Sequence, residues 1–160
     1  MVKVVKFGGS SLASAEQFRK VSEIIHADKD RRYVVPSAPG KRGSKDTKVT
    51  DMLYDCYSAA GDAESLTKKM AAIQARYQEI IDGLGLELSL DEQFKEIRER
   101  FEQHAGSDYA ASRGEYLNGI VLAAYLEYDF IDAAEVICFD EDGVFDAEKT
   151  DEKMRARLEE

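Results

Sequence analysis

Two short apolar runs with a helical pattern between them fill the first 36 residues, and they constrain the fold more than any other feature. Residues 2–7 are rich in valine and end at a Gly-Gly pair, and residues 33–35 end at Pro36, so each run is predicted to be a short buried strand. Ser10 and Ser11 are expected to cap the helix between them. Its apolar face is predicted to contain Phe18, Val21, Ile24 and Ile25. Such a βαβ unit implies parallel strands and a right-handed crossover.

The remainder of the chain is mostly helical in pattern. A helix is expected from about Val49, and two amphipathic helices separated by Gly83 and Gly85 predict an αα-hairpin over residues 66–101. Ser107 or Asp108 is expected to cap a further helix. A third strand is predicted at residues 133–139, then a turn at residues 140–143 and the start of a helix at residues 151–160.

Composition limits the classes of function. The 160 residues are 44% apolar, which is enough for a core, and no internal domain boundary is evident. The net charge of −10 argues against general binding to nucleic acid or to an anionic membrane. An exception is the basic segment 41–48, which could either close over a ligand or be simply solvated.

Targeting and redox features favour a cytoplasmic protein. The N-terminus has no long apolar region typical of a signal peptide, and no apolar run reaches the length of a membrane span. Cys56 and Cys138 follow no paired spacing, so two reduced thiols are expected rather than a disulfide. Neither His26 nor His104 has zinc-ligand spacing with the cysteines, and residues 140–143 lack the ligands of a calcium loop, so no metal site is predicted.

The strongest candidate for chemistry is the segment from Lys6 to Ser11. A lysine at the end of a strand, two glycines and two hydroxyls form a turn that can hold phosphate oxygens through backbone N–H groups and a compact positive charge. The alternative is a tight strand-to-helix turn with an incidental lysine. The spacing matches neither a P-loop nor a dinucleotide-binding glycine motif.

Two further segments carry polar groups to places where a ligand could bind. Ser37 and Gly40 follow the second strand, and the ends of two parallel strands converge on one crevice. Ser112, Glu115 and Gly119 share one stripe of a helix, and a partly buried Glu115 would need a cationic partner such as a substrate ammonium. The alternatives are an ordinary turn after the strand and an internal salt bridge to Glu115.

Taken together, these segments resemble the aspartate kinase branch of the amino-acid kinase family. Four motifs carry the resemblance, and they occur in the family's order across most of the chain. They are K-F-G-G-S-S at residues 6–11, V-V-P-S-A-P-G at residues 34–40, K-V-T-D-M-L at residues 48–53 and S-R-G-E-Y-L at residues 112–117.

The resemblance implies a three-layer α/β/α fold with a mostly parallel sheet and an inserted αα-hairpin. It also implies transfer of the γ-phosphoryl group of ATP to the β-carboxylate of L-aspartate, with Mg²⁺ held mainly through the ATP phosphates. On the nucleotide side, Lys6 would neutralise charge on the transferring phosphoryl group, and Gly8, Gly9 and Ser10 would cradle phosphate oxygens. Ser10 replaces the more usual threonine and keeps the hydroxyl.

On the acceptor side, the resemblance implies that Ser37 lies beside the reacting centre, Thr50 binds the aspartate carboxylate and Glu115 binds the α-ammonium. Residues 1–160 would form the N-terminal portion of the catalytic domain, incomplete at the C-terminus. The family's later nucleotide-binding segment and its ACT regulatory domains are absent, so the chain alone is expected to be inactive. The full-length enzyme is expected to form homo-oligomers.

Two alternatives stay open. Another amino-acid kinase, acting on glutamate, N-acetylglutamate or a nucleotide, would share the lysine and glycine opening, although Val49-Thr50-Asp51 and Glu115 favour a free amino acid. A non-catalytic fragment that self-associates through the hairpin or an exposed sheet edge is the second alternative.

Overall fold

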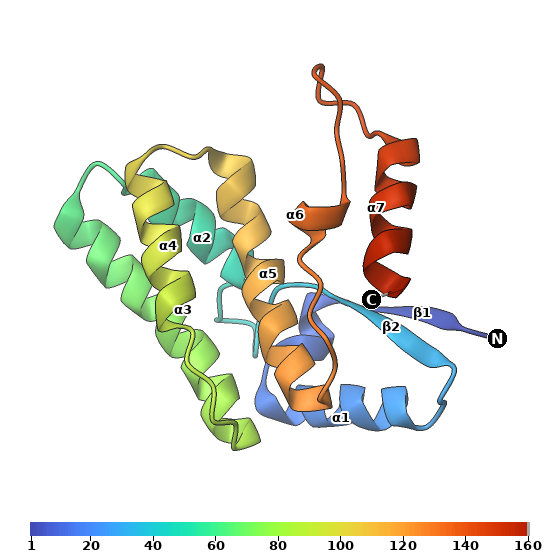
Figure 1. The fold of residues 1–160 in the computed structure, drawn as a ribbon. Coiled ribbons are helices and arrows are strands. Elements are labelled where there is room, and N and C mark those ends of the chain that lie inside the picture. Colours follow the sequence, from blue (N-terminus) through green and yellow to red (C-terminus); the bar gives the residue numbers. More distant parts are fainter. Residues whose placement is uncertain (160) are drawn as a thin grey trace. The chain divides into compact units, whose positions relative to one another are not determined.

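The computed structural model describes residues 1–159 and divides the chain into two compact units, Met1–Tyr128 and the segment from Asp129 onward. The first unit contains both strands and most of the helices (Figure 1). The second unit is small and contains two helices among its described residues, α6 (Ala133–Val136) and α7 (Ala147–Glu159).

The predicted βαβ unit is confirmed, but the expected burial of its strands is wrong, because Val4 is 68% exposed and Val35 is 50% exposed. Strand β1 (Lys3–Phe7) pairs in parallel with β2 (Arg31–Pro36), and helix α1 (Ala15–His26) connects them. The expected capping by Ser10 and Ser11 is wrong, because those residues lie inside a separate 3-10 turn, η1 (Gly9–Leu12). The cap of α1 is instead Ser14, whose Oγ accepts a hydrogen bond from the backbone N–H of Gln17 at 3.4 Å.

Four helices follow β2 and pack beside one another on one side of the strands (Figure 1). They are α2 (Val49–Ser58), α3 (Ala63–Leu84), α4 (Asp91–Glu102) and α5 (Ser107–Leu126). The predicted αα-hairpin is α3 and α4, and α3 ends at Gly85, whose φ of 69° is a left-handed conformation that glycine adopts readily. Gly106 precedes α5 with no side-chain cap, so the expected cap at Ser107 or Asp108 is wrong.

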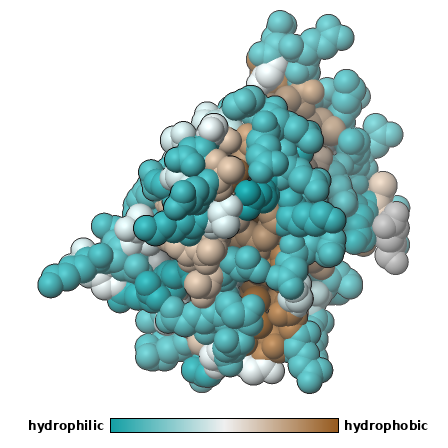
Figure 2. All heavy atoms as spheres, turned by 90° about the vertical axis from the view of Figure 1, so that its left-hand side faces the viewer, coloured by the Kyte–Doolittle hydropathy of each residue, from teal (hydrophilic) through white to brown (hydrophobic). Residues whose placement is uncertain are grey.

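The core of the first unit is formed by the apolar faces of these helices and one face of the two strands. Three of the four predicted core residues of α1 are buried, but Ile24 is 48% exposed. Tyr77, Phe94 and Phe101 join the two hairpin helices to the rest of the core. Viewed from the α3 side, the surface is mainly hydrophilic (Figure 2), as expected when the apolar faces of helices turn inward.

The second unit differs from its sequence-based prediction. The expected strand at residues 133–139 is wrong: α6 (Ala133–Val136) occupies its first half, and Asp132 accepts a hydrogen bond from the N–H of Ala134 at 2.9 Å as an N-cap. Phe139 forms only an isolated antiparallel bridge with Phe145. The turn at residues 140–143 is confirmed, and α7 (Ala147–Glu159) follows it.

The described residues therefore contain one two-stranded parallel sheet within a mixed α/β chain. Among residues 1–159, none of the helices combines the length and the apolar character needed to cross a lipid bilayer. Cys56 and Cys138 both have free thiols; Cys56 is buried and Cys138 is half-buried.

Candidate active site

A pocket of about 440 Å³ lies where β1 and β2 end, and it collects most of the predicted site residues. Ends of parallel strands are the usual ligand-binding edge of an α/β sheet. The pocket is bounded by residues 9–10, by residues 37–50 and by α5. Its lining residues are Gly9, Ser10, Ser37, Ala38, Pro39, Gly40, Lys41, Lys48, Thr50 and Glu115.

Two segments that are distant in sequence meet at this pocket through their backbones. We call residues 8–12 the first loop and residues 37–48 the second loop. The N–H of Gly40 donates to the carbonyl oxygen of Gly9 at 2.8 Å. A Cβ on Gly40 would lie 2.6 Å from the carbonyl carbon of Gly9, and a Cβ on Gly9 would lie 2.8 Å from the carbonyl oxygen of Ala38. Both glycines are therefore required for this close approach of the two loops.

Lys6 and Gly8 lie beside the first loop but do not line the pocket. The ammonium nitrogen of Lys6 lies 3.9 Å from the position that a Cβ of Gly8 would occupy, so the lysine side chain approaches the backbone of the loop. Lys6 is exposed, which leaves its charge accessible to a ligand at the end of β1. Of the seven predicted site residues, five line the pocket and these two flank it.

Helix α5 contacts the start of the second loop with two side chains one turn apart. The N–H of Ala38 donates to Oε1 of Glu115 at 3.4 Å, and Nδ2 of Asn118 donates to the carbonyl oxygen of Ser37 at 2.7 Å. Asn118 is fully buried. Asn118 is not among the site residues predicted from the sequence, although its spacing of three residues from Glu115 places both on one helix face.

Small residues bring α5 close enough to make these contacts. A Cβ on Gly114 would lie 2.7 Å from Cβ of Ala38. The carbonyl oxygen of Gly114 accepts a hydrogen bond from the hydroxyl of Tyr77 at 2.7 Å. Burial raises the pKa of Tyr77 well above its ordinary value, and the negative charge of Glu115 raises it further, so Tyr77 is a neutral donor.

The expectation of a partly buried Glu115 is wrong, because its side chain is exposed at the edge of the pocket. Exposure follows from its place on α5, where Gly114 and Leu117 face inward and Glu115 turns away from them. The carboxylate is therefore open to an incoming cation rather than enclosed by a protein partner.

The pocket combines charges of both signs. Lys41 and Lys48 supply two cations, and Glu115 supplies one anion. Ser10, Ser37 and Thr50 add hydroxyls, and Thr50 is held in the first turn of α2, where the N–H of Val49 donates to the carbonyl oxygen of Pro39 at 3.1 Å. Such a set suits a small ligand with several negative groups and one positive group.

Comparison with known proteins gives consistent relatives. The chain is 40% identical over 146 residues to aspartokinase 3 of Bacillus subtilis, covering 84% of this chain and 31% of that protein. It is 32% identical over 129 residues to an aspartokinase of Chlamydia trachomatis, covering 76% of this chain and 27% of the relative. The chain thus spans about a third of the length of these curated relatives.

Solved structures resemble the chain over nearly its whole length. Aspartate kinase from Clostridium acetobutylicum superimposes with a TM-score of 0.92 at 47% identity, over 98% of this chain and 36% of that one. Aspartokinase III of Escherichia coli, solved with aspartate and ADP, shares the fold with a TM-score of 0.78 at 20% identity, over 99% of this chain and 38% of that one. The model of the amino acid kinase family matches residues 1–160. The chain therefore belongs to the amino acid kinase family.

Proposed function

We propose that this chain carries the aspartate-binding side of an aspartate kinase, which transfers the γ-phosphoryl group of ATP to the β-carboxylate of L-aspartate. The observation that carries the proposal is the pocket in which Ser37, Thr50 and Glu115 meet two lysines. Aspartate has two carboxylates and one ammonium, which matches the charges of that lining. The named relatives are aspartate kinases of which the chain spans about a third, so activity is proposed for the whole protein.

The roles of the residues follow from the chemistry of the reaction. An oxygen of the β-carboxylate attacks the γ-phosphorus, the bond from phosphorus to the bridging oxygen breaks, and ADP leaves. A carboxylate needs no general base, so the protein has to position the reactants and offset charge. Glu115 would bind the α-ammonium and Thr50 a carboxylate. Ser37 would lie beside the reacting centre.

The first loop supports the phosphate side of the proposal. Gly8 and Gly9 let the backbone approach a ligand, the Ser10 hydroxyl lines the pocket, and Lys6 places a compact charge at the end of β1. Lys6 would neutralise negative charge on the transferring phosphoryl group. Mg²⁺ would accompany ATP and be held mainly through its phosphates, as this ion usually is at such sites.

Calorimetric titration of the 160-residue chain with L-aspartate, and separately with Mg·ATP, tests the proposal. We expect L-aspartate to bind, and Glu115→Gln to weaken that binding at least about tenfold because the ammonium loses its charged partner. Glu92→Gln, a change of another exposed glutamate on α4, serves as the matched control and should bind normally. Absence of aspartate binding to the unaltered chain would contradict the proposed acceptor site.

A ligand panel separates the alternatives within the family. L-Glutamate is one methylene longer, and N-acetyl-L-glutamate lacks the ammonium that Glu115 would bind, so both should bind more weakly than L-aspartate. Tighter binding of either would assign the chain to another amino-acid kinase. The free thiols support a reducing, cytoplasmic location. Homo-oligomerisation of the full-length enzyme stays a prediction.

A further inference from the structure

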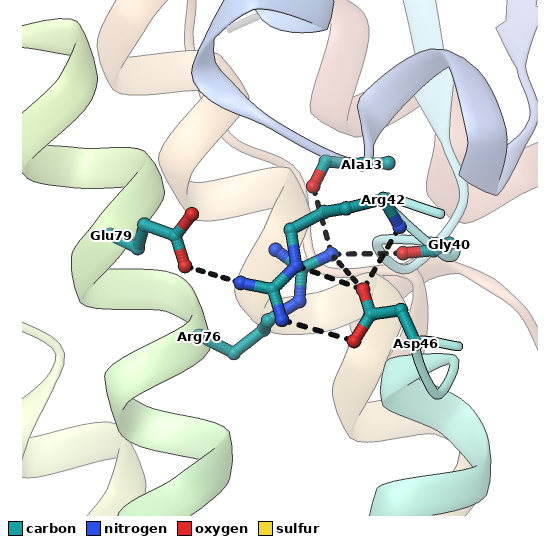
Figure 3. A network of polar contacts seen from close by, with 6 residues as sticks. All are labelled: Ala13, Gly40, Arg42, Asp46, Arg76 and Glu79. Atoms are coloured by element: carbon teal, nitrogen blue, oxygen red, sulfur yellow. Dashed lines mark hydrogen bonds and ion pairs between the residues drawn. The ribbon is translucent and has the colours of Figure 1, made fainter. Parts of the chain in front are cut away.

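A buried arginine on α3 connects the two loops that form the pocket. Only 3% of the Arg76 side chain is exposed. Its Nη2 donates to the carbonyl oxygen of Ala13 at 2.8 Å and to that of Gly40 at 2.9 Å (Figure 3). Ala13 directly follows the first loop, and Gly40 lies in the second. One guanidinium therefore holds the backbones of both loops.

The charge of Arg76 is balanced by the only acidic residue of the second loop. Oδ2 of Asp46 lies 3.5 Å from Nη2 of Arg76. Burial lowers the pKa of Arg76, and the nearby charge of Arg42 lowers it further, whereas Asp46 opposes both effects. A buried cation is costly without such a partner, so the position of Asp46 against α3 is tied to the burial of Arg76.

Asp46 also folds the second loop on itself. Its carboxylate accepts hydrogen bonds from Arg42: from the backbone N–H at 2.9 Å, from Nε at 2.8 Å and from Nη2 at 3.0 Å. These bonds hold the pKa of Asp46 well below its ordinary value. Arg42 extends further to Glu79 on α3, as Figure 3 shows. The loop is thus anchored to α3 at two points one helical turn apart, Arg76 and Glu79.

This network distinguishes Arg42 from the three lysines of the loop, Lys41, Lys45 and Lys48. Arg42 is neutralised by Asp46 and Glu79. Lys41 and Lys48 line the pocket, and neither has an ion-pair partner within residues 1–159. With its acidic residue held against α3, the loop presents to the pocket two cations without ion-pair partners among residues 1–159.

A purely stabilising role accounts poorly for Arg76. Its Nε and Nη1 are buried without hydrogen-bond partners in the described part of the chain, and unsatisfied buried donors are unfavourable. A well-packed apolar residue at this position would avoid that cost. An apolar residue could not, however, hold two backbone carbonyls and a loop carboxylate at once.

We propose that Arg76 is a positioning residue that acts through Asp46: together they hold the second loop closed against α3, so that Lys41 and Lys48 face the anionic ligand of the pocket. The identity of that ligand as aspartate rests on the proposed function, whereas closure of the loop does not. The proposal thereby assigns ligand-binding roles to two lysines and a positioning role to an ion pair outside the pocket.

Limited trypsin digestion with mass mapping of the cleavage sites tests loop closure directly. Asp46→Asn removes the charge that faces Arg76 and should open the loop, so cleavage after Lys41, Arg42, Lys45 or Lys48 should become at least about tenfold faster, because proteolysis follows the population of the open form. Cleavage after Lys95 within α4 requires unfolding of that helix and should stay much slower than cleavage in the loop. Asp55→Asn, which removes an exposed ion pair with Lys69 on α3, is the matched control and should digest like the unaltered chain.

Two results would overturn the proposal at the level of the loop. Equal cleavage of Asp46→Asn and the unaltered chain would show that the ion pair does not hold the loop. Cleavage after Lys95 as fast as cleavage in the loop would show a general loss of stability instead. Arg76→Lys offers a second test, because a lysine keeps the charge but cannot span both carbonyls and Asp46 in the same planar arrangement; it should open the loop as Asp46→Asn does.

Titration with L-aspartate separates positioning from the proposed function. If the loop opens in Asp46→Asn, the dissociation constant for L-aspartate should rise about tenfold, with Asp55→Asn unchanged. An open loop with unchanged affinity would overturn the positioning role. Absence of aspartate binding to the unaltered chain would count against the proposed function alone, and the digestion result would still decide whether Arg76 and Asp46 close the loop.

Discussion

The first and second loops meet at the same pocket but are fixed by different means. The first loop is a short turn whose close approach depends on the absence of side chains at Gly9 and at Gly40 opposite. The second loop is longer and charged, and it is held by side chains of helices that are distant in sequence: Arg76 and Glu79 on α3, and Asn118 on α5. One loop is defined by backbone geometry and the other by a network of polar contacts.

This difference teaches how each loop should respond to change. A close backbone contact between glycines leaves no room for an added atom, so a single methyl group there should strongly lower the free energy of unfolding. A polar network is shared among several side chains, so removal of one of them should lower the free energy of unfolding by less. Because the network contains ionisable groups, this loss should depend on pH. Substitutions at the two kinds of contact therefore test the contrast.

Gly40→Ala should destabilise the first unit most. The added Cβ would lie 2.6 Å from the carbonyl carbon of Gly9 and 2.8 Å from the backbone nitrogen of Ser10, and neither backbone can move without disturbing η1. We expect a loss of about 3 kcal/mol in the free energy of unfolding, measured by urea denaturation. Gly61→Ala, where no atom lies within 4 Å, is the control and should change stability by less than about 0.5 kcal/mol. Similar losses at both positions would contradict the backbone contact.

Asp46→Asn should have a smaller effect that depends on pH. At pH 7 we expect a loss of about 2 kcal/mol, because charge-assisted hydrogen bonds to Arg42 are removed. Hydrogen bonds from Arg42 lower the pKa of Asp46 in the folded state. The contribution of Asp46 to the free energy of unfolding is therefore complete above its unfolded-state pKa of about 3.9. This contribution is lost as the pH falls below that value towards the folded-state pKa. Urea denaturation from pH 7 to pH 3 should show the difference between the two proteins shrinking with acid. A constant difference would refute the ion-pair account.

Tyr77→Phe should have the smallest effect of the three. The hydroxyl of Tyr77 donates to the carbonyl oxygen of Gly114, next to Glu115, and its removal leaves that buried oxygen without this donor. We expect a loss of about 1 kcal/mol by urea denaturation. Tyr54→Phe is the matched control, since Tyr54 is 43% exposed, and should be nearly neutral. A neutral Tyr77→Phe would mean that the α5 contact does not depend on this bond.

The parts predicted well from the sequence are those governed by short-range patterns. Short valine-rich runs that end at Gly-Gly or proline predicted the strands of the βαβ unit, and helical spacing of apolar residues predicted the αα-hairpin, because these patterns are local properties. Gly9, Ser10 and Ser37 lie at one pocket, as expected of loops that follow two parallel strands. Thr50 and Glu115 line the same pocket from α2 and α5, and the roles of all five residues stay predictions.

The predictions that were wrong or incomplete concern two kinds of residue. Some lie where two local structures compete, and others act through partners that are distant in sequence. Residues 133–139 looked like a strand, but an Asp132 cap and two alanines favour a short helix at its start. Ser14 caps α1 in place of Ser10 and Ser11, since η1 intervenes. The contacts of Arg76 and Asn118 were not predicted, because the sequence around each residue does not show that it donates a hydrogen bond to a carbonyl oxygen of the second loop.

The most direct test of the central claim is a comparison of L-aspartate with succinate as ligands in calorimetry. Both carry two carboxylates, but succinate lacks the α-ammonium that Glu115 is proposed to bind. We predict that the 160-residue chain binds L-aspartate at least about tenfold more tightly than succinate, that Glu115→Gln abolishes this preference and that Glu92→Gln keeps it. Equal affinities for the two ligands, or a full preference in Glu115→Gln, would contradict the account.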